Sequence, residues 1–207
     1  MTTLPAGVRL APLDPPYDPD LGRTLARMMP PGVPPLKLFR TVAHNRHLLD
    51  KLRSTGTYLL NFGTIEPRAR ELVILRTCAR CRCEYEWGVH VHVFAAQVGL
   101  SEAQIAATVT ASAADEPWAH QESLLIALVD ELHETGNLSD RLWHDLAEHY
   151  SSAQLVELVA LAGHYHGVSF LANALGVELE DGAARFPEPQ AGGSGQTPAI
   201  ELPSRRH

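Results

Sequence analysis

Residues 71–90 have the sequence ELVILRTCARCRCEYEWGVH, and this stretch decides both the fold class and the candidate chemistry. An apolar helical pattern extends to a break at Arg82, after which the sequence predicts a second helix that begins at Cys83. At about 100° per residue, steps of three and four residues return nearly to the starting face of a helix. Cys83, Glu86 and His90 therefore share one stripe. A thiol, a carboxylate and an imidazole on one stripe indicate a site for thiol or proton-transfer chemistry.

Glu71 precedes this stripe, in the first of the two helices, and supports two interpretations. Ile74, Leu75 and Cys78 lie on its side of the helix, so burial would raise the pKa of its carboxyl group toward the range useful for proton transfer. Alternatively, Glu71 is an exposed residue of the first helical turn, where the helix dipole favours a negative charge. Periodicity leaves both interpretations open.

Cys83 has the environment expected of a reactive cysteine. A helix N-terminus, with Arg80 and Arg82 nearby, would stabilise the thiolate and lower the thiol pKa. The glutamates that follow oppose this effect, and a small buried residue is the alternative interpretation. His90 is seven residues further along the helix, roughly 10 Å at 1.5 Å per residue. Glu86 or a water molecule would therefore have to lie between the thiol and the imidazole.

Composition excludes several classes of protein. The chain has 207 residues, with 24 acidic against 17 Lys and Arg residues, a balance that argues against nucleic-acid binding. We expect no membrane span and no signal peptide, and hence a cytoplasmic protein. Its three cysteines, Cys78, Cys81 and Cys83, form no disulfide framework of a secreted domain. The CxxC of the first two lacks a second zinc-type pair, so we expect no metal site.

Helical signals dominate the chain, so the expected fold class is all-α in a single domain. We expect a proline-rich N-terminal arm over residues 1–35, a helical domain over 36–186 and a disordered tail over 187–207. Capping residues, prolines and glycines predict helices around 21–29 and over 36–45, 46–60, 68–80, 83–98, from 101, 118–134, 140–150 and 152–175.

The remaining histidines give weaker signals. His164 and His166 flank a tyrosine in an apolar run, where a structural hydrogen-bond partner is the usual role of a histidine, and one of the two is a candidate to line a pocket. His44 and His47 lie in a polar amphipathic segment and are expected to be solvated. His92 points nearly opposite to His90 on a helix, which argues against a metal site built on that pair.

The pattern resembles the carboxymuconolactone decarboxylase and alkylhydroperoxidase D superfamily over about residues 36–179. The resemblance rests on Pro67-x3-Glu71-Leu-Val-Ile-Leu-Arg, on Cys83-Glu-Tyr-Glu86-Trp-Gly-x-His90, on Gly99-Leu-Ser and on the closing AGHYHGVSFLANALGV. It implies an all-α fold that assembles into trimers or hexamers as a homo-oligomer. It also implies a small-molecule substrate in a pocket near a subunit boundary, and no cofactor.

In the alkylhydroperoxidase D branch, a glutamate precedes a Cys-x-x-Cys-x3-His helix. Glu71, Cys83 and His90 match this pattern, but Glu86 stands where the second cysteine should be. Cys81 or an external thiol would then have to resolve an oxidised Cys83. The first expectation is a thiol-dependent hydroperoxide reductase, an antioxidant enzyme, with Cys83 as the attacking thiolate. In it, Glu71 and His90 relay protons, and Glu86 orients His90 or binds water.

Two alternatives stay open. The decarboxylase branch implies a cofactor-free decarboxylase or isomerase that acts on a carboxylated or lactone substrate through Glu71, Glu86 and His90. No arginine set is evidently dedicated to such a substrate, beyond the group Arg68, Arg70, Arg76, Arg80 and Arg82. The third possibility is a non-catalytic member that keeps the fold as an oligomeric scaffold.

Overall fold

The computed structural model describes residues 7–115 and 117–188, and within them the chain contains helices and no β-strand. The all-α expectation is confirmed. The helices are α1 (Pro19–Ala26), α2 (Lys37–Val42), α3 (Arg46–Asn61), α4 (Pro67–Arg80), α5 (Glu84–His90), the π-helix η1 (Val91–Ala95), α6 (Glu102–Thr110), α7 (His120–Thr135), α8 (Asp140–Ala147) and α9 (Ser152–Leu175).

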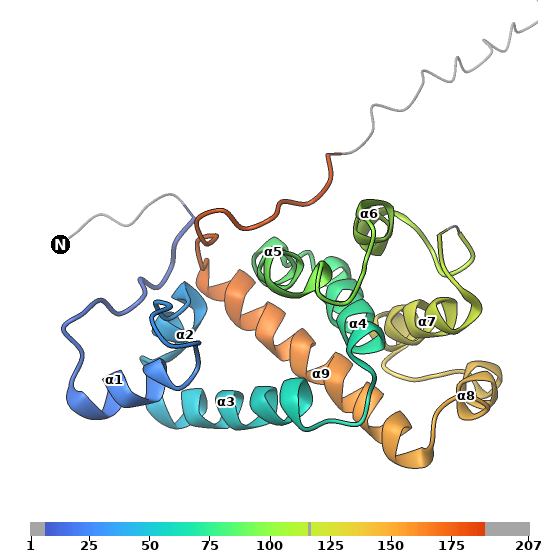
Figure 1. Ribbon diagram of the computed structural model, residues 1–207, viewed down its shortest axis with the longest axis horizontal. Helices are drawn as coiled ribbons and strands as arrows, with labels where there is room; N and C mark the ends of the chain where they lie inside the picture. Colours follow the sequence, from blue (N-terminus) through green and yellow to red (C-terminus); the bar gives the residue numbers. More distant parts are fainter. Residues whose placement is uncertain (1–6, 116, 189–207) are drawn as a thin grey trace, which may run out of the picture.

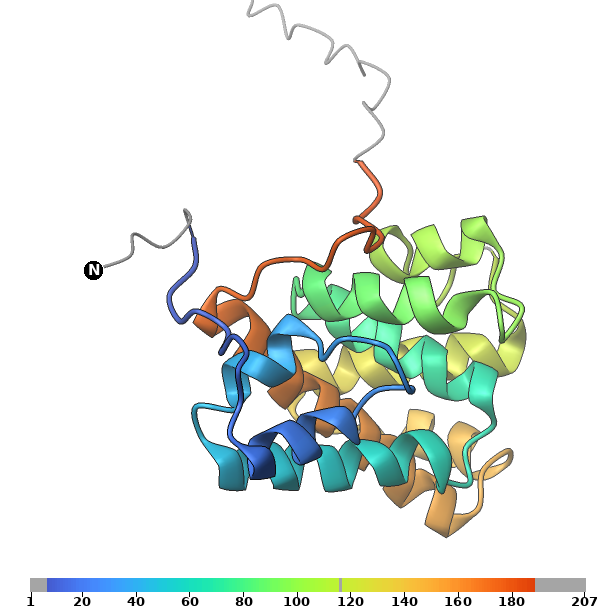
Figure 2. The ribbon, with the colours of Figure 1, turned by 60° about the vertical axis from the view of Figure 1, so that its left-hand side comes forward.

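Helix α9 crosses the middle of the molecule, with α1–α3 on one side and α4–α8 on the other (Figure 1). It packs against α4, α5, α2, α3 and α8. The turned view shows α3 along the lower edge, with α1 beside it (Figure 2). Because α9 contacts both groups of helices, it holds the N-terminal helices over the part of the molecule that carries the 71–90 stretch.

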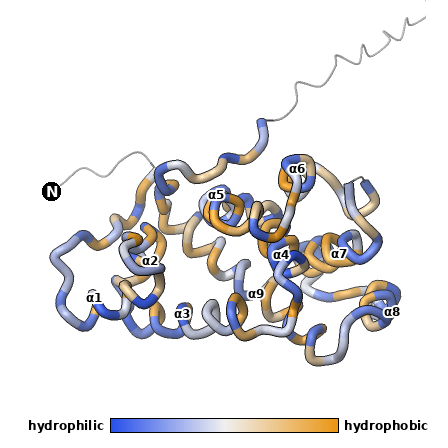
Figure 3. Tube along the Cα trace, viewed as in Figure 1, coloured by the Kyte–Doolittle hydropathy of each residue, from blue (hydrophilic) through white to orange (hydrophobic). Residues whose placement is uncertain are grey.

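Helix α4 supplies the densest part of the core. Glu66 caps its N-terminus by accepting a bond from the Ala69 amide, and Pro67 occupies the first turn, where a missing N–H costs nothing. The eight residues from Glu71 to Cys78 are all buried, because neighbouring helices cover several faces of α4 at once. Figure 3 shows apolar residues alternating with polar ones along most helices, as expected of helices that bury one face.

Helix positions agree closely with the sequence pattern, apart from one irregular segment. The predicted helix over 83–98 instead changes at Val91 into the five-residue π-helix η1, and the turns after it end at Gly99, which has φ +67°. The N-terminal arm contains the expected short helix, and its Leu21 and Leu25 are buried in the common core. Of the predicted tail, residues 189–207 lie outside the described part.

Within the described residues, α9 alone is long and apolar enough to cross a membrane by length and composition, and half of its most apolar window is buried. Its place at the centre of the helix packing accounts for that composition. Its exposed side carries Val156 and Phe170, which offer an apolar surface for the homo-oligomer that the resemblance implies. The trimer or hexamer stays a prediction.

The segment after α9 lies across α5 and fixes it in place. It leaves α9 at Gly176, a left-handed position with φ +65°, and returns over the second group of helices (Figure 1). The Phe186 ring meets Trp87 edge-on at 5.1 Å, and the Phe186 amide donates to Glu84 at 2.8 Å. At Gly88 this segment and α5 lie so close together that an added Cβ would be 2.3 Å from the Ala184 carbonyl oxygen.

Gly88→Ala should therefore destabilise the protein by about 1–3 kcal/mol, because the new methyl group would collide with backbone that cannot move away easily. Urea unfolding followed by circular dichroism measures this. Gly22→Ala is the matched control, since an added Cβ there would lie in ordinary contact, 3.9 Å from the Tyr17 Cβ, within α1, and alanine has the higher helix propensity. It should stabilise the protein slightly. Equal effects of the two substitutions would contradict the close contact at Gly88.

Candidate acid–base site

Two helices bring the predicted site residues together. Glu71 lies in α4, and Glu86 and His90 lie in α5. Between the helices, Arg82 takes a left-handed conformation with φ +53°, which ends α4 and turns the chain back along it. The sequence-predicted break at Arg82 is confirmed. Helix α5 begins directly after Cys83 and packs against α4, so its last turn reaches the first part of that helix.

Glu71 and His90 form a buried hydrogen-bonded pair. The Nδ1 of His90 donates to Oε2 of Glu71 at 2.7 Å, with side chains only 4% and 1% exposed. The other carboxylate oxygen of Glu71 accepts from Nε of Arg70 at 3.1 Å, and Arg70 also donates to the Leu60 carbonyl at 2.8 Å. Of the two interpretations of Glu71, the structure supports the buried one. The bond to Nδ1 fixes the imidazole ring and leaves Nε2 directed away from α4.

Glu86 lies on the other side of His90. Its Oε1 is 3.5 Å from Nε2 of His90. Its Oε2 is buried and has no hydrogen-bond partner among the described residues. A buried carboxylate oxygen without a partner is costly in a folded protein. Its presence here indicates an acceptor for something that the polypeptide does not itself provide.

The three groups set the charge state of His90. Burial opposes a charge on the imidazole, but the Glu71 carboxylate, through its charge and hydrogen bond, and Glu86 outweigh burial and raise the pKa of His90 to about 9. His90 is therefore an imidazolium at neutral pH, held between two carboxylates. In this state, His90 can donate a proton and Glu86 can accept one.

Glu86 and His90 line a cavity of about 490 Å³ between the two groups of helices. Most of its wall is apolar, with residues of the N-terminal segment, α2, α3, η1 and α9, among them Met28, Phe39, Leu52, Leu60, Phe94 and Val168. The volume suits a small organic molecule. The π-helix brings the Phe94 ring to 5.1 Å from His90, on the cavity wall. Local π-helical turns often accompany functional sites.

His164 and Tyr165 complete the wall from α9. The Tyr165 ring meets His90 edge-on at 5.1 Å, and His164 is the histidine of its pair that lines the cavity. Burial lowers the pKa of His164, although the Glu86 charge opposes that shift. His164 is therefore neutral at pH 7, in contrast to His90. His44 and His47 are exposed, as predicted, and His92, near the start of η1, is exposed as well.

Cys83 does not have the exposed, low-pKa thiol that the sequence predicted. It is 0% exposed and does not line the cavity. Burial raises the pKa of its thiol to about 11, and the negative charge of Glu86 acts in the same direction. The prediction of a lowered thiol pKa at Cys83 is wrong, because burial dominates over the helix N-terminus and the nearby arginines. Cys83 lies on the α5 stripe with Glu86 and His90, as periodicity predicts.

Two arginines that the sequence did not single out border the cavity, Arg27 and Arg53. Neither forms an ion pair with an acidic residue in the described part of the chain, and Nε of Arg53 is buried without a hydrogen-bond partner there. The arginines considered from sequence are mostly committed elsewhere. Arg68 pairs with Glu122, Arg70 with Glu71, and Arg76 and Arg80 with Asp130.

Residues 47–130 match the family model of the carboxymuconolactone decarboxylase family. This segment includes α4, α5 and the three residues Glu71, Glu86 and His90. No curated protein matches the sequence.

Several solved structures share the fold. A peroxidase-related protein from Silicibacter sp. is 11% identical, with a TM-score of 0.74 over 87% of this chain and 95% of that one. A protein of unknown function from Agrobacterium tumefaciens, described as a candidate antioxidant defence protein AhpD, is 19% identical, with a TM-score of 0.62 over 67% and 94%. The debrominase Bmp8, as a Cys-to-Ala variant with 2,3,4-tribromopyrrole, is 14% identical, with a TM-score of 0.63 over 87% and 93%.

The raised pKa of His90 predicts a pH-dependent stability. The folded pKa of about 9 exceeds the ordinary value of 6.5, so the imidazolium stabilises the fold fully below about pH 6.5, and this contribution disappears as the pH rises through about 9. It amounts to up to about 3 kcal/mol. The difference in unfolding free energy between the wild type and His90→Gln should shrink by that order between pH 6.5 and about 9.5. Urea unfolding at both pH values measures it.

Two further variants serve as controls for this titration. In Glu71→Gln, the NMR titration midpoint of His90 should fall well below the wild-type value, because burial then acts against Glu86 alone. His164→Gln should leave the pH dependence between 6.5 and about 9.5 unchanged, since the pKa of His164 is already lowered. A His90 midpoint near or below 6.5 in the wild-type protein would contradict the assigned charge state.

Proposed function

Residues 47–130 match the carboxymuconolactone decarboxylase family model, and we propose that the chain is an enzyme of the decarboxylase or isomerase type. In this proposal Glu86 and His90 transfer protons to and from a small carboxylated molecule. One observation carries it. Glu86, whose Oε2 has no hydrogen-bond partner among the described residues, and the imidazolium of His90 line an apolar cavity, whereas Cys83 does not.

The roles follow from the geometry. Glu86 Oε2 takes a proton from a substrate carbon next to a carbonyl group, and the electron pair moves onto the carbonyl oxygen. His90, held by Glu71 through Nδ1, stabilises that oxygen from its Nε2 side. Return of the proton from Glu86 to another carbon completes an isomerisation. In a decarboxylation, the bond to the carboxylate breaks instead, CO2 leaves with the electron pair remaining on carbon, and His90 protonates that carbon. Neither route requires an oxidant or a reductant.

The cavity supports a carboxylated substrate with an apolar body. Arg53, whose buried Nε has no hydrogen-bond partner in the described part of the chain, and the more exposed Arg27 can bind a carboxylate at the end of the cavity formed by α1 and α3. Leu and Phe side chains of the remaining wall provide the apolar contact surface. The lactone or carboxylated compound expected from the decarboxylase branch has this combination of groups.

Thiol-dependent hydroperoxide reduction is the second candidate function. It is supported by the place of Cys83 three residues before Glu86 and by the likeness to structures described as peroxidase-related and AhpD-like. The Cys83 thiolate would attack the peroxide, break the O–O bond and become a sulfenic acid, with release of water or an alcohol. Two external thiols would then reduce the sulfenic acid and form their own disulfide. The burial and raised pKa of Cys83 weaken this candidate.

Three substitutions separate the two functions. We expect Glu86→Gln and His90→Gln each to lower turnover by at least about 100-fold, and Cys83→Ser to leave it nearly unchanged. The substrates are unsaturated γ-lactones that carry a carboxylate, and the corresponding 3-oxo acids. NMR measures deuterium incorporation from D2O, and coupled detection measures CO2 release.

The same variants have a second assay with cumene hydroperoxide and dithiothreitol. Loss of peroxide turnover in Cys83→Ser, with full turnover in Glu86→Gln, would overturn the proton-transfer proposal and favour the thiol function. Activity in neither assay would favour the non-catalytic scaffold.

Carboxylate recognition has its own test. Calorimetry should show that trans-cinnamate binds the wild-type protein and that cinnamyl alcohol, its uncharged counterpart, binds at least about tenfold more weakly. Arg53→Gln should remove most of that preference, because a charge-assisted bond contributes about 1.5–3 kcal/mol. Arg68→Gln is the matched control, since Arg68 is committed to Glu122 outside the cavity. Equal affinity for acid and alcohol would contradict the assignment of Arg53.

A further inference from the structure

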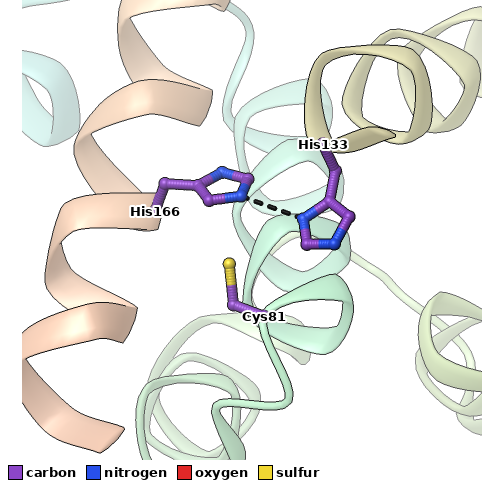
Figure 4. Close-up of side chains that lie close together, drawn as sticks. All are labelled: Cys81, His133 and His166. Carbon is purple, nitrogen blue, oxygen red and sulfur yellow. Dashed lines mark hydrogen bonds between the residues drawn. The ribbon is translucent and has the colours of Figure 1, made fainter. Parts of the chain in front are cut away.

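A second group of reactive side chains lies apart from the acid–base cavity. Cys81 follows the last residue of α4, His133 is in the last turn of α7, and His166 is near the middle of α9 (Figure 4). None of the three lines the cavity. The Cys81 sulfur and one nitrogen of each histidine all lie within 4.8 Å of one another. The chain therefore brings one soft and two borderline metal ligands to a single point from three different helices.

The distances between the three candidate ligand atoms are close to those around a bound metal ion. Nδ1 of His133 and Nε2 of His166 face each other at 2.9 Å. Around a tetrahedral Zn²⁺, bond lengths of about 2.0–2.1 Å to nitrogen and 2.3 Å to sulfur place two nitrogens about 3.3 Å apart and a nitrogen and sulfur about 3.6 Å apart. The histidine nitrogens need to separate by only a few tenths of an ångström. Cys81 needs a shift of about 1 Å, which side-chain rotation supplies.

The backbone that carries these ligands is already in place. Helix α4 packs against both α7 and α9. The Nδ2 of Asn173 donates to the Cys81 carbonyl at 2.9 Å and so links the end of α4 to α9. A site on such elements loses little conformational entropy when it binds an ion. His133 is exposed, and Cys81 and His166 are half-buried, so an ion can reach all three from solvent.

Nearby charges do not oppose a cation. The positive charge of Arg80 acts on His133, and Arg80 pairs with Asp130 and Glu134 on α7. Arg76 also pairs with Asp130, so the charges of the two arginines are balanced by these two carboxylates. They also provide the polar surroundings in which histidine ligands are usually oriented.

We propose that Cys81, His133 and His166 bind one first-row transition-metal ion of the Zn²⁺ type, through Sγ, Nδ1 and Nε2 respectively. A thiolate with two imidazoles favours Zn²⁺, Co²⁺, Ni²⁺ or copper over Mg²⁺ and Ca²⁺, which prefer oxygen ligands. Three protein ligands leave a fourth position for water or an exogenous ligand. Binding displaces the hydrogen bond between the histidines and releases the Cys81 proton. The ion joins α4, α7 and α9, and the site is independent of the acid–base cavity.

Cobalt titration of the full chain tests this site directly. We expect one Co²⁺ per chain, with a visible spectrum of tetrahedral type, a thiolate-to-metal charge-transfer band and displacement by Zn²⁺. Cys81→Ser should remove the charge-transfer band. His133→Gln/His166→Gln should weaken Zn²⁺ binding at least about 100-fold, because it removes two ligands where loss of a supporting group alone costs 10–100-fold. A hundredfold excess of Zn²⁺ over its Kd should raise the wild-type Tm by about 5 °C or more.

His120 and His149 provide the matched control. They are another surface histidine pair, with ring centroids 5.8 Å apart, but they belong to no such ligand group among the described residues. His120→Gln/His149→Gln should bind Zn²⁺ as the wild type does. The proposal is overturned if the wild type binds no ion, or if His133→Gln/His166→Gln retains wild-type affinity. Circular dichroism of each variant without metal confirms that these surface substitutions preserve the helices.

Discussion

The hydrogen bond between Glu71 and His90 is the interaction on which the site depends, because it makes burial of several charges tolerable. A lone ionised carboxylate in a protein interior is strongly disfavoured. Here Arg70, Glu71, His90 and Glu86 follow one another with alternating charge. Each charged group stabilises the one next to it in space. Glu86 is the last member of this row of charges, and it lines the cavity. The last carboxylate oxygen has no hydrogen-bond partner among the described residues, so the cost of its burial is not offset there.

The packing of the helices holds these four charged residues in position. Helix α4 is enclosed by other helices and holds Glu71 rigidly. The left-handed residue Arg82 returns the chain so that α5 lies against α4, and the segment over Gly88 prevents α5 from moving outward. The cavity itself needs the N-terminal helices. Residues 27–30 and α3 close it opposite His90, so the proline-rich arm contributes to the site as well as to the core.

Local patterns predicted the helices and the shared face of Cys83, Glu86 and His90, since both depend on near neighbours in sequence. They could not decide whether Glu71 was buried, because burial depends on helices distant in the chain. The same limitation explains the error at Cys83, where desolvation outweighs the helix N-terminus. Arg53 was missed because its place in the cavity wall, with a buried Nε that has no partner among the described residues, depends on helices distant in the sequence. Cys81, His133 and His166 lie in three separate helices, and their spacing gives no sequence motif.

The substitution at position 86 has the largest chemical consequence. A cysteine there would stand beside His90 on the cavity wall, where peroxide could reach it and where Cys83 could form a disulfide with it. A glutamate at the same place cannot take part in thiol exchange, but it accepts protons and raises the pKa of His90. It also adds a negative charge that further raises the pKa of Cys83. The one residue therefore favours proton transfer and disfavours a thiolate, on a fold shared with structures described as a candidate antioxidant defence protein and a peroxidase-related protein.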